Sequence, residues 1–312
     1  VFVNGVSAGR HRGGYASFTL DITPYVREGE NVLTVCAEDD NRTGLQPRGK
    51  QSSEYHSHGC DYTRTTGIWQ TVWLEHVPSV YVAAIKYYPD AGNATVHMEV
   101  EFDGRTVGSA SVKVAGSRCR LALPLSESHL WAPGEPRLYD LSLSLDGVRS
   151  DGTAFADRIE SYFGLRTVTW DGHSIQINGK PVFQRLILDQ GFWPDGIYTA
   201  RSDEELRADL ERSMAMCFKG ARMHEQIFEA RFIHWADRMG YLVWGEMANW
   251  GLDITTPMGL ERFLPEWLES VKRDFNSPAL VGWCPFNETW DAPNALGAGR
   301  TAQDDEVLRL VY

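Results

Sequence analysis

The chain has 312 residues, enough for two or three domains at roughly 100–200 residues each. Its formal net charge of −12 argues against a nucleic-acid partner, because the chain has no excess of basic side chains to neutralise phosphates. No apolar run approaches the roughly 20 residues that a membrane-spanning helix requires, so no membrane partner is predicted. A hydrophobic fraction of 43% is typical of a globular chain, and this balance suits a neutral small-molecule or sugar substrate.

The cysteines predict neither a zinc site nor a disulfide framework. There are five of them, widely spaced and without a CxxC pair. Their positions are Cys36, Cys60, Cys119, Cys217 and Cys284. We expect buried, reduced thiols.

Residues 1–77 have the pattern of an all-β module. Asn4-Gly5 favours a tight hairpin turn, because both residues tolerate positive φ angles. Alternation of apolar and polar residues predicts strands over 18–22, 31–37 and 67–75. The polar stretch 39–62 is expected to be a long surface loop. Several short strands separated by turns indicate a β-sandwich.

Residues 78–166 predict a second all-β module with a scaffold role. Strands are expected over 80–88, 94–102, 109–115, 118–123, 139–145 and 159–164. Asp103-Gly104 and Asp146-Gly147 are placed as hairpin turns. This size and strand number are typical of an immunoglobulin-like sandwich.

From residue 167 onward, strands alternate with helices, which predicts a parallel sheet. Each of four strands is followed by polar residues, and a last helix is expected over 303–312. The strand-end residues are Asp189, then Arg222 and His224, then Glu246, then Asn287 and Glu288. Four such units match the first half of a (β/α)₈ TIM barrel, in which the carboxyl ends of the strands line the active site.

The fourth strand ends in Asn287-Glu288, with Trp283 before it and Trp290 after it. A carboxyl group enclosed by aromatic rings keeps a raised pKa and can donate a proton. The alternative is a solvated acid in a loop.

Several motifs, in this order, resemble those of glycoside hydrolase family 2. They are Phe2-Val3-Asn4-Gly5, Thr66-Gly67-Ile68-Trp69-Gln70, Leu130-Trp131-Ala132-Pro133, Phe163-Gly164-Leu165-Arg166 and Arg273-Asp274-Phe275-Asn276-Ser277-Pro278, followed by Asn287-Glu288-Thr289-Trp290. The family comprises exo-acting β-glycosidases such as β-galactosidase, β-glucuronidase and β-mannosidase. The resemblance implies a jelly-roll-like β-sandwich over 1–77, an immunoglobulin-like sandwich over 78–166 and a catalytic TIM barrel from 167 to 312, of which strands 1–4 are present.

The resemblance also assigns residue roles. It implies Glu288 as the general acid/base of a retaining mechanism and Asn287 as the residue that bonds the sugar 2-hydroxyl. Arg222, His224, Glu246, Asp189 and Trp290 are expected to contact a carbohydrate substrate. Two alternatives to contact with the sugar stay open. Arg222 could brace carboxylates inside the barrel, and Glu246 could simply pair with Arg222.

The resemblance implies no required metal, and no cofactor is predicted. The family's nucleophile is a Glu after the seventh barrel strand, so we expect the chain to be a fragment, truncated at both ends and inactive alone. β-Galactosides are favoured as substrates, with β-glucuronides and β-mannosides as alternatives. A non-catalytic carbohydrate-binding protein and an inverting hydrolase that uses Glu246 are the competing functions. The compartment and the oligomeric state, a homo-oligomer included, are left open.

Overall fold

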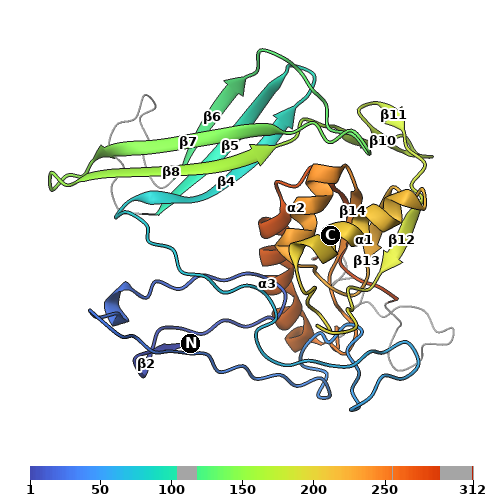
Figure 1. Ribbon diagram of the computed structural model, residues 1–312, viewed down its shortest axis with the longest axis horizontal. Coiled ribbons are helices and arrows are strands. Elements are labelled where there is room, and N and C mark those ends of the chain that lie inside the picture. Colours follow the sequence, from blue (N-terminus) through green and yellow to red (C-terminus); the bar gives the residue numbers. More distant parts are fainter. Residues whose placement is uncertain (104–117, 255, 289–310, 312) are drawn as a thin grey trace.

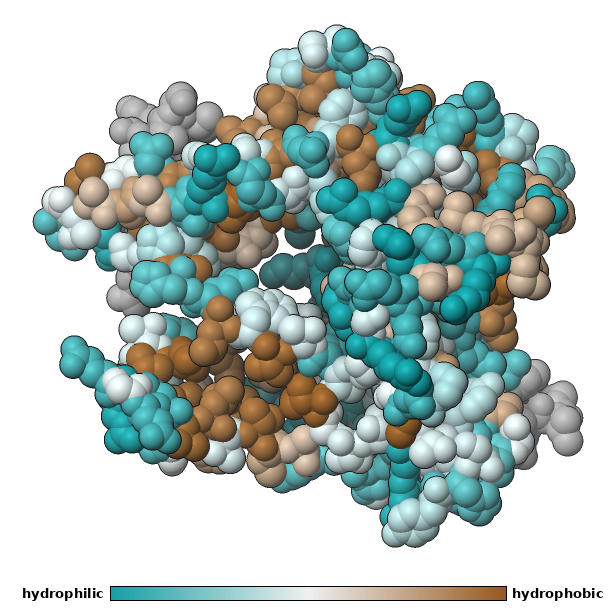
Figure 2. Space-filling view, viewed as in Figure 1, coloured by the Kyte–Doolittle hydropathy of each residue, from teal (hydrophilic) through white to brown (hydrophobic). Residues whose placement is uncertain are grey.

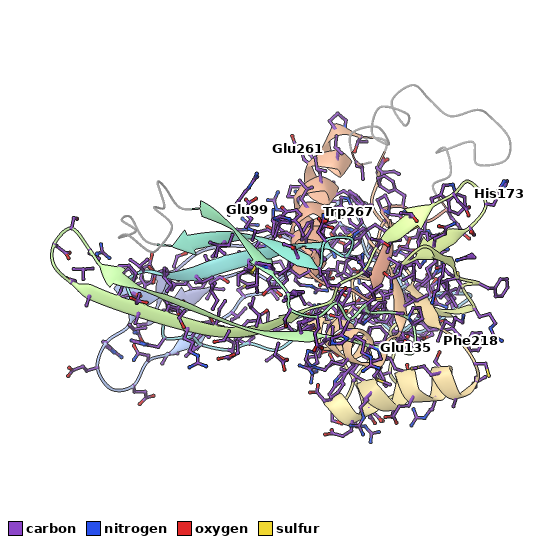
Figure 3. All side chains as sticks on the ribbon, turned by 90° about the horizontal axis from the view of Figure 1, so that it is seen from above. Glu99, Glu135, His173, Phe218, Glu261 and Trp267 are labelled. Carbon is purple, nitrogen blue, oxygen red and sulfur yellow. The ribbon has the colours of Figure 1, made fainter. Side chains whose placement is uncertain are left out.

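The computed structural model describes residues 1–103, 118–254, 256–288 and 311. Figure 1 shows long antiparallel strands at the upper left, helices at the centre and an N-terminal segment that runs beneath the strands. Figure 3 gives the arrangement from above, with Glu99 among the long strands and Trp267 on a helix beside them. Among the described residues, no helix is long and apolar enough to cross a membrane.

The C-terminal part contains a parallel sheet of four strands in sequential order. Its strands are β12 (Leu186–Asp189), β13 (Gly220–Met223), β14 (Leu242–Glu246) and β15 (Leu280–Cys284). The helices between them are α1 (Asp203–Ala215), α2 (Ala230–Met239) and α3 (Pro257–Asp274). The predicted alternation of strand and helix is therefore present. The helix expected over 303–312 lies outside the described residues, apart from Val311.

Local signals account for the helix ends. The Ser202 Oγ accepts a hydrogen bond from the N–H of Glu205 and caps α1. Gly240 ends α2 at φ 70°, a left-handed conformation that favours glycine. The helices bury Leu206, Leu210 and Phe232 against the sheet. Leu268 is exposed because α3 presents Phe263 and Trp267 on its buried side.

The two faces of the parallel sheet have different neighbours. Strand side chains alternate between faces, and the register aligns Ala221 with Val243 on the side that the helices cover. Arg222 aligns with Trp244 on the opposite side. On that side Glu246 aligns with Cys284. This face, called here the open face, collects the polar strand-end residues.

The middle part consists of two antiparallel sheets around one core. One sheet has the order β4-β5-β6 and the other pairs β7 with β8. Their bounds are Tyr81–Asp90, Thr95–Asp103, Arg118–Pro124, Tyr139–Val148 and Ala154–Phe163. Val96 and Tyr87 from the first sheet share a buried cluster with Leu141 and Phe163 from the second. The strand expected over 109–115 lies outside the described residues.

The turn between β7 and β8 differs from its prediction. Asp146-Gly147 lies inside β7, where Gly147 pairs with Phe155. The chain reverses instead over 149–153, with Gly152 at φ 86° and an N–H···O=C bond from Arg149 to Thr153. The Phe155 ring covers the α-carbon of Gly147, leaving no room for a side chain. The turn therefore contains Gly152, whereas Gly147 is packed within the strand.

A small antiparallel sheet connects the middle part to the parallel sheet. It has the order β11-β10-β9, with β9 at Val168–Trp170, β10 at Ile175–Ile177 and β11 at Lys180–Pro181. Asn178 and Gly179 form its turn with positive φ angles.

The N-terminal residues form far less sheet than expected. Only β1 (Phe2–Val3), β2 (Val6–Ser7) and β3 (Leu33–Thr34) pair, and one 3₁₀ turn, η1, covers Thr23–Tyr25. The strands predicted over 18–22 and 67–75 are not formed, and the described residues here do not form the predicted sandwich. The reason is that period-two alternation marks a face for burial, but a sheet also needs a paired strand and a covering layer.

The uncovered side chains are visible on the surface. Phe18, Leu33, Trp73 and Leu74 are exposed. Figure 2 shows apolar surface gathered at the lower left, over the N-terminal segment. The expectation of buried thiols is also wrong for Cys36, Cys60 and Cys217, which are exposed, while Cys284 is half-buried; all four are free.

Three of the motifs that resemble family 2 contain a residue that joins two parts of the structure. The Trp131 indole N–H donates to the carbonyl of Asp237 in α2 over 2.8 Å. The Arg166 guanidinium donates to the carbonyls of Pro278 and Leu280 at the start of β15. Asn276 bonds both main-chain groups of β4 that face it, with its Nδ2 on the Ile85 carbonyl and its Oδ1 on the Tyr87 N–H.

Trp131→Ala is expected to lower the free energy of unfolding by about 3–5 kcal/mol, because the indole is fully buried between the middle part and α2. Trp170→Ala is the matched control, because Trp170 is 66% exposed and its loss should change stability by less than about 0.5 kcal/mol. Urea denaturation followed by circular dichroism measures both. Equal midpoints for the two variants would contradict the assigned joint.

Candidate active site

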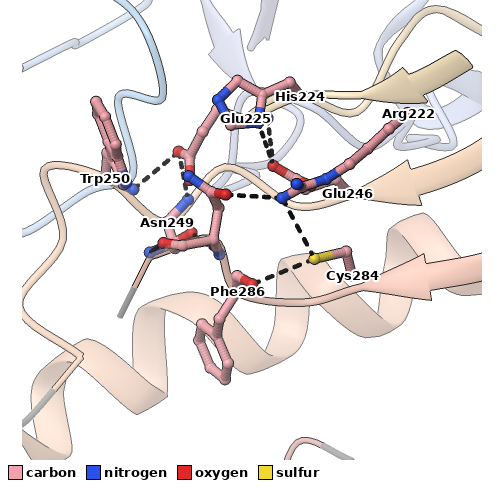
Figure 4. A network of polar contacts seen from close by, with 9 residues as sticks. Arg222, His224, Glu225, Glu246, Asn249, Trp250, Cys284 and Phe286 are labelled. Carbon is pink, nitrogen blue, oxygen red and sulfur yellow. Dashed lines mark hydrogen bonds and ion pairs between the residues drawn. The ribbon is translucent and has the colours of Figure 1, made fainter. Parts of the chain in front are cut away.

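The centre of the site is the carboxylate of Glu246, which has no exposed surface. The Arg222 Nε donates to its Oε2 over 2.5 Å, and the N–H of Glu225 donates to its Oε1 over 2.8 Å. The His224 Nδ1 lies 2.9 Å from the same Oε1 (Figure 4). Burial alone raises the pKa of Glu246, but His224, the Glu225 N–H and Arg222 outweigh it and hold the pKa below its usual value. The carboxylate is thus a fixed negative charge.

Asn287 is attached to this pair from the neighbouring strand. Its Oδ1 accepts a hydrogen bond of 2.7 Å from the Arg222 Nη2. Its main chain is held on both sides by the Asn249 side chain, at 2.7 Å for the N–H and 3.1 Å for the carbonyl. The Asn287 Nδ2 is buried and has no hydrogen-bond partner among the described residues. A donor in that state is available to a ligand.

Glu288 follows at the strand end, with an exposed side chain and φ 45°. The expected enclosure by two indoles is not what the structure describes. Trp283 faces the helices, where it packs edge-on against Trp267 with 5.3 Å between ring centres. Trp290 lies outside the described residues. Glu288 itself is exposed.

Asp189 does not join the other predicted site residues. It aligns with Met223, whose side chain lies in the core on the helix side of the sheet. There it lines a cavity of about 240 Å³ together with Phe192, Asp209 and Gln226. Burial raises the pKa of Asp189 to about 6, against the opposing bond from the Gly191 N–H. Successive side chains of a strand point to opposite faces of the sheet, and Asp189 is one register position from the partner of Arg222. Asp189 and Arg222 therefore lie on opposite faces.

The sequence reasoning missed Glu225, which is fully buried at φ 54°. Its Oε2 accepts hydrogen bonds of 3.0 Å from the N–H groups of both Asn249 and Trp250. Burial raises the pKa of Glu225 to about 8, although these two N–H groups oppose the rise. Its position directly after His224, at the end of a buried strand, was the available signal.

The loop 39–62 was expected on the surface but is partly buried over the site. The N–H groups of Arg48 and Gly49 both donate to the Trp250 carbonyl, over 2.8 and 3.2 Å. Lys50 is 5% exposed, and its Nζ lies 3.5 Å from the centre of the Trp250 ring. Ser52 is buried with its Oγ donating to the His56 carbonyl. Polar residues are buried here because their groups are paired within the loop and with the sheet.

The remaining polar groups limit the chemistry of the site. Burial and the nearby Glu246 charge raise the pKa of Cys284 to about 11, so its thiol stays protonated and is a poor nucleophile. Among the described residues, no group of three or more His, Cys, Asp or Glu side chains is arranged to hold a metal ion. The arrangement is a fixed carboxylate, an oriented amide donor and an accessible carboxyl group.

Residues 82–166 match the family model of glycosyl hydrolases family 2. A putative β-glucuronidase of Formosa agariphila is 24% identical over 94% of this chain and 37% of its own length. A β-galactosidase of Thermoanaerobacter pseudethanolicus is 24% identical over 93% of this chain and 41% of its own length.

The fold is also that of a solved enzyme. A β-glucuronidase from Ruminococcus gnavus, in complex with D-glucuronic acid, superposes with a TM-score of 0.76 at 17% identity, covering 99% of this chain and 54% of the other. Over nearly all of its length the chain is similar to glycoside hydrolases, and residues 82–166 match the model of family 2. The chain spans less than half the length of the two curated relatives.

Arg222→Met is expected to lower the free energy of unfolding by about 3 kcal/mol, because it strands the buried charge of Glu246. Adding Glu246→Gln removes that charge and should recover most of the loss. Urea denaturation at pH 7 measures both variants. A double variant as unstable as the single one would mean that the charge of Glu246 does not set the cost.

Glu225→Gln is expected to change how stability depends on pH. Folding raises the pKa of Glu225 from 4.5 to about 8, so the folded state holds a proton that the unfolded state releases. The stability from this proton is fully present below pH 4.5 and is lost as the pH rises towards 8. Relative to the variant, the wild type should therefore lose about 1.4 kcal/mol per pH unit between pH 5 and 7.

Urea denaturation at pH 5, 6 and 7 measures this difference. Glu261→Gln, at an exposed position of α3, is the control and should show no such trend. A wild-type minus Glu225→Gln difference that is constant with pH would rule out a buried, protonated Glu225.

Proposed function

We propose that this chain, within the polypeptide that its gene encodes, takes part in hydrolysis of terminal β-glycosidic bonds with retention of configuration. Glu288 is the general acid/base. The observation that carries the proposal is the buried Nδ2 of Asn287, which lacks a partner among the described residues and lies next to the accessible carboxyl of Glu288. A donor and a proton source side by side fit a sugar and its glycosidic oxygen.

Asn287 is proposed to bind the sugar. Because its Oδ1 accepts from Arg222, the amide is turned so that Nδ2 is left to donate. A sugar 2-hydroxyl oxygen can accept that bond. Such a bond strengthens as positive charge develops on the ring in the transition state, and it supplies part of the rate enhancement. His224, which is nearly buried beside Glu246, is proposed as a second contact with sugar hydroxyls.

Glu288 is proposed to act twice. In the first step a carboxylate nucleophile forms a bond to C1 while the protonated carboxyl of Glu288 transfers its proton to the glycosidic oxygen; the bond from that oxygen to C1 breaks, and the aglycone leaves as an alcohol. In the second step the Glu288 carboxylate takes a proton from water, whose oxygen bonds to C1 as the bond from C1 to the nucleophile breaks and releases the nucleophile as a carboxylate. Its accessible side chain permits both the aglycone and the water to approach.

Glu246 is proposed as an electrostatic brace. Its two oxygens are occupied by Arg222 and by the Glu225 N–H, and it has no exposed surface. A carboxylate without exposed surface is not reached by a substrate water. This supports the retaining mechanism over an inverting one based on Glu246, and it also favours the bracing role for Arg222.

Retention requires a second carboxylate about 5–5.5 Å from the acid. Glu246 and Glu225 are both engaged in internal hydrogen bonds, so we assign neither this place. We propose that the nucleophile follows Tyr312 in the polypeptide, on a later strand of a complete TIM barrel whose first four strands are β12–β15. In this scheme residues 78–166 are the immunoglobulin-like module, and Trp290 keeps its predicted role as a contact of the sugar.

The sugar is proposed to be a β-galactoside or a β-glucuronide. The printed names of the two curated relatives divide between these activities. β-Mannosides are the third substrate to assay.

Glu288→Gln, made in the polypeptide of the complete gene, is expected to lower kcat/KM for phenyl β-glycosides by about 10²–10⁴, because the amide cannot donate an acidic proton. Binding of the sugar should be retained, since Asn287 is unchanged. Steady-state kinetics and calorimetric titration with the free sugar measure the two effects. Glu261→Gln, on the exposed side of α3, is the matched control.

An unchanged rate in Glu288→Gln would refute the catalytic role. Binding of the sugar without any hydrolysis by the wild-type polypeptide would instead support a carbohydrate-binding protein.

A further inference from the structure

We propose that Asn249 is a positioning residue for the acid/base step, and that Glu225 holds Asn249 in place. The inference rests on the proposed role of Glu288. It concerns two residues that do not touch the reacting atoms in this arrangement. Their action is on the backbone that carries Glu288.

The need for a positioning device arises where the sheet ends. The last aligned pair of β14 and β15 is Glu246 with Cys284, and one further bond joins the Met247 N–H to the Cys284 carbonyl. Asn287 lies three residues beyond Cys284, where the described residues form no strand ladder. The main chain before Glu288 must therefore be held by other groups.

The Asn249 side chain forms the hydrogen bonds that a neighbouring strand would otherwise form with Asn287. Its Oδ1 accepts from the Asn287 N–H over 2.7 Å, and its Nδ2 donates to the Asn287 carbonyl over 3.1 Å. One amide thus bonds both main-chain groups of one residue, as an adjacent strand would. Together with the bond from Arg222 to the Asn287 side chain, three contacts fix Asn287 before the chain reaches Glu288.

This fixation matters because Glu288 has φ 45°. A non-glycine residue rarely adopts that left-handed conformation without support from its surroundings. Release of the Asn287 main chain allows Glu288 to return to an ordinary conformation. The direction of its side chain would then change, and with it the distance from the carboxyl to a glycosidic oxygen.

Glu225 holds the main chain of Asn249 in place. Its Oε2 accepts from the N–H groups of Asn249 and Trp250, so both ends of one short segment are tied to one buried oxygen (Figure 4). The loop 39–62 also holds this segment, because the N–H groups of Arg48 and Gly49 donate to the Trp250 carbonyl. Gly49 lies so close to the Glu225 carbonyl that a β-carbon there would be 2.2 Å away. The segment 249–250 is therefore fixed between a buried acid and a loop.

The test separates a misplaced acid from general damage. Departure of a phenol from an aryl β-glycoside needs protonation when the phenol is a weak acid, and needs none for 2,4-dinitrophenol. Asn249→Ala is expected to lower kcat/KM for the phenyl glycoside about 10²-fold and to change the 2,4-dinitrophenyl glycoside by less than about threefold. The measurement uses aryl β-galactosides and β-glucuronides with the polypeptide of the complete gene.

Companion variants keep the test decisive. Asn249→Asp retains the acceptor for the Asn287 N–H and the volume of the side chain, so it should fold and show a smaller loss of the same kind.

Glu225→Ala should reproduce the selective loss, and Glu225→Gln, which keeps an oxygen for both N–H groups, should recover most of it. Thr256→Ala removes the cap of α3 in the same connection, and should lower the melting temperature without any selectivity for the leaving group.

The outcomes distinguish this inference from the function on which it rests. Glu288→Gln must itself show the dependence on the leaving group, and its failure to do so refutes the acid/base role. If Glu288→Gln shows it while Asn249→Ala and Asn249→Asp lose activity equally on both glycosides, only the positioning inference is overturned. A wild-type polypeptide that hydrolyses none of these glycosides overturns both.

Discussion

The buried charge of Glu246 is the constraint on which the site depends. A carboxylate without exposed surface is unstable unless hydrogen-bond donors surround it, and here the donors come from the end of the neighbouring strand. Arg222 reaches Glu246 with one nitrogen and Asn287 with another. Because Arg222 must neutralise Glu246, it also fixes the amide of Asn287, which is proposed to bind the substrate. Glu246 itself has no exposed surface.

A second constraint is the alternation of side chains along parallel strands. Arg222 and Glu246 lie on the open face, whereas Asp189, one register position away, lies on the helix side. Polar residues at strand ends are thus divided between two environments. Those on the open face build the candidate active site, and Asp189 belongs to a separate cavity with Asp209.

The motifs that mark the family divide in the same way between chemistry and assembly. Asn287 and Glu288 are at the site, but Asn276 bonds β4 and Arg166 bonds the residues that open β15. Burial of these joints ties the middle part to the parallel sheet, so the position of the strand end depends on contacts made far from it. The N-terminal segment contributes through the loop over Trp250 while leaving apolar side chains such as Trp73 exposed.

The sequence by itself determined the alternation of strands and helices and the presence of Asn287 and Glu288 shortly after the fourth strand, because periodicity and turn residues act over a few neighbouring positions. Only the tertiary structure decided that Asp189 faces the helices, that the loop 39–62 is partly buried, and that Glu225 and Asn249 hold the main chain before Glu288. These facts depend on strand register and on hydrogen bonds between residues far apart in the sequence, such as Asn249 and Asn287, or Arg48 and Trp250. Pairing of that kind leaves no local pattern in the chain.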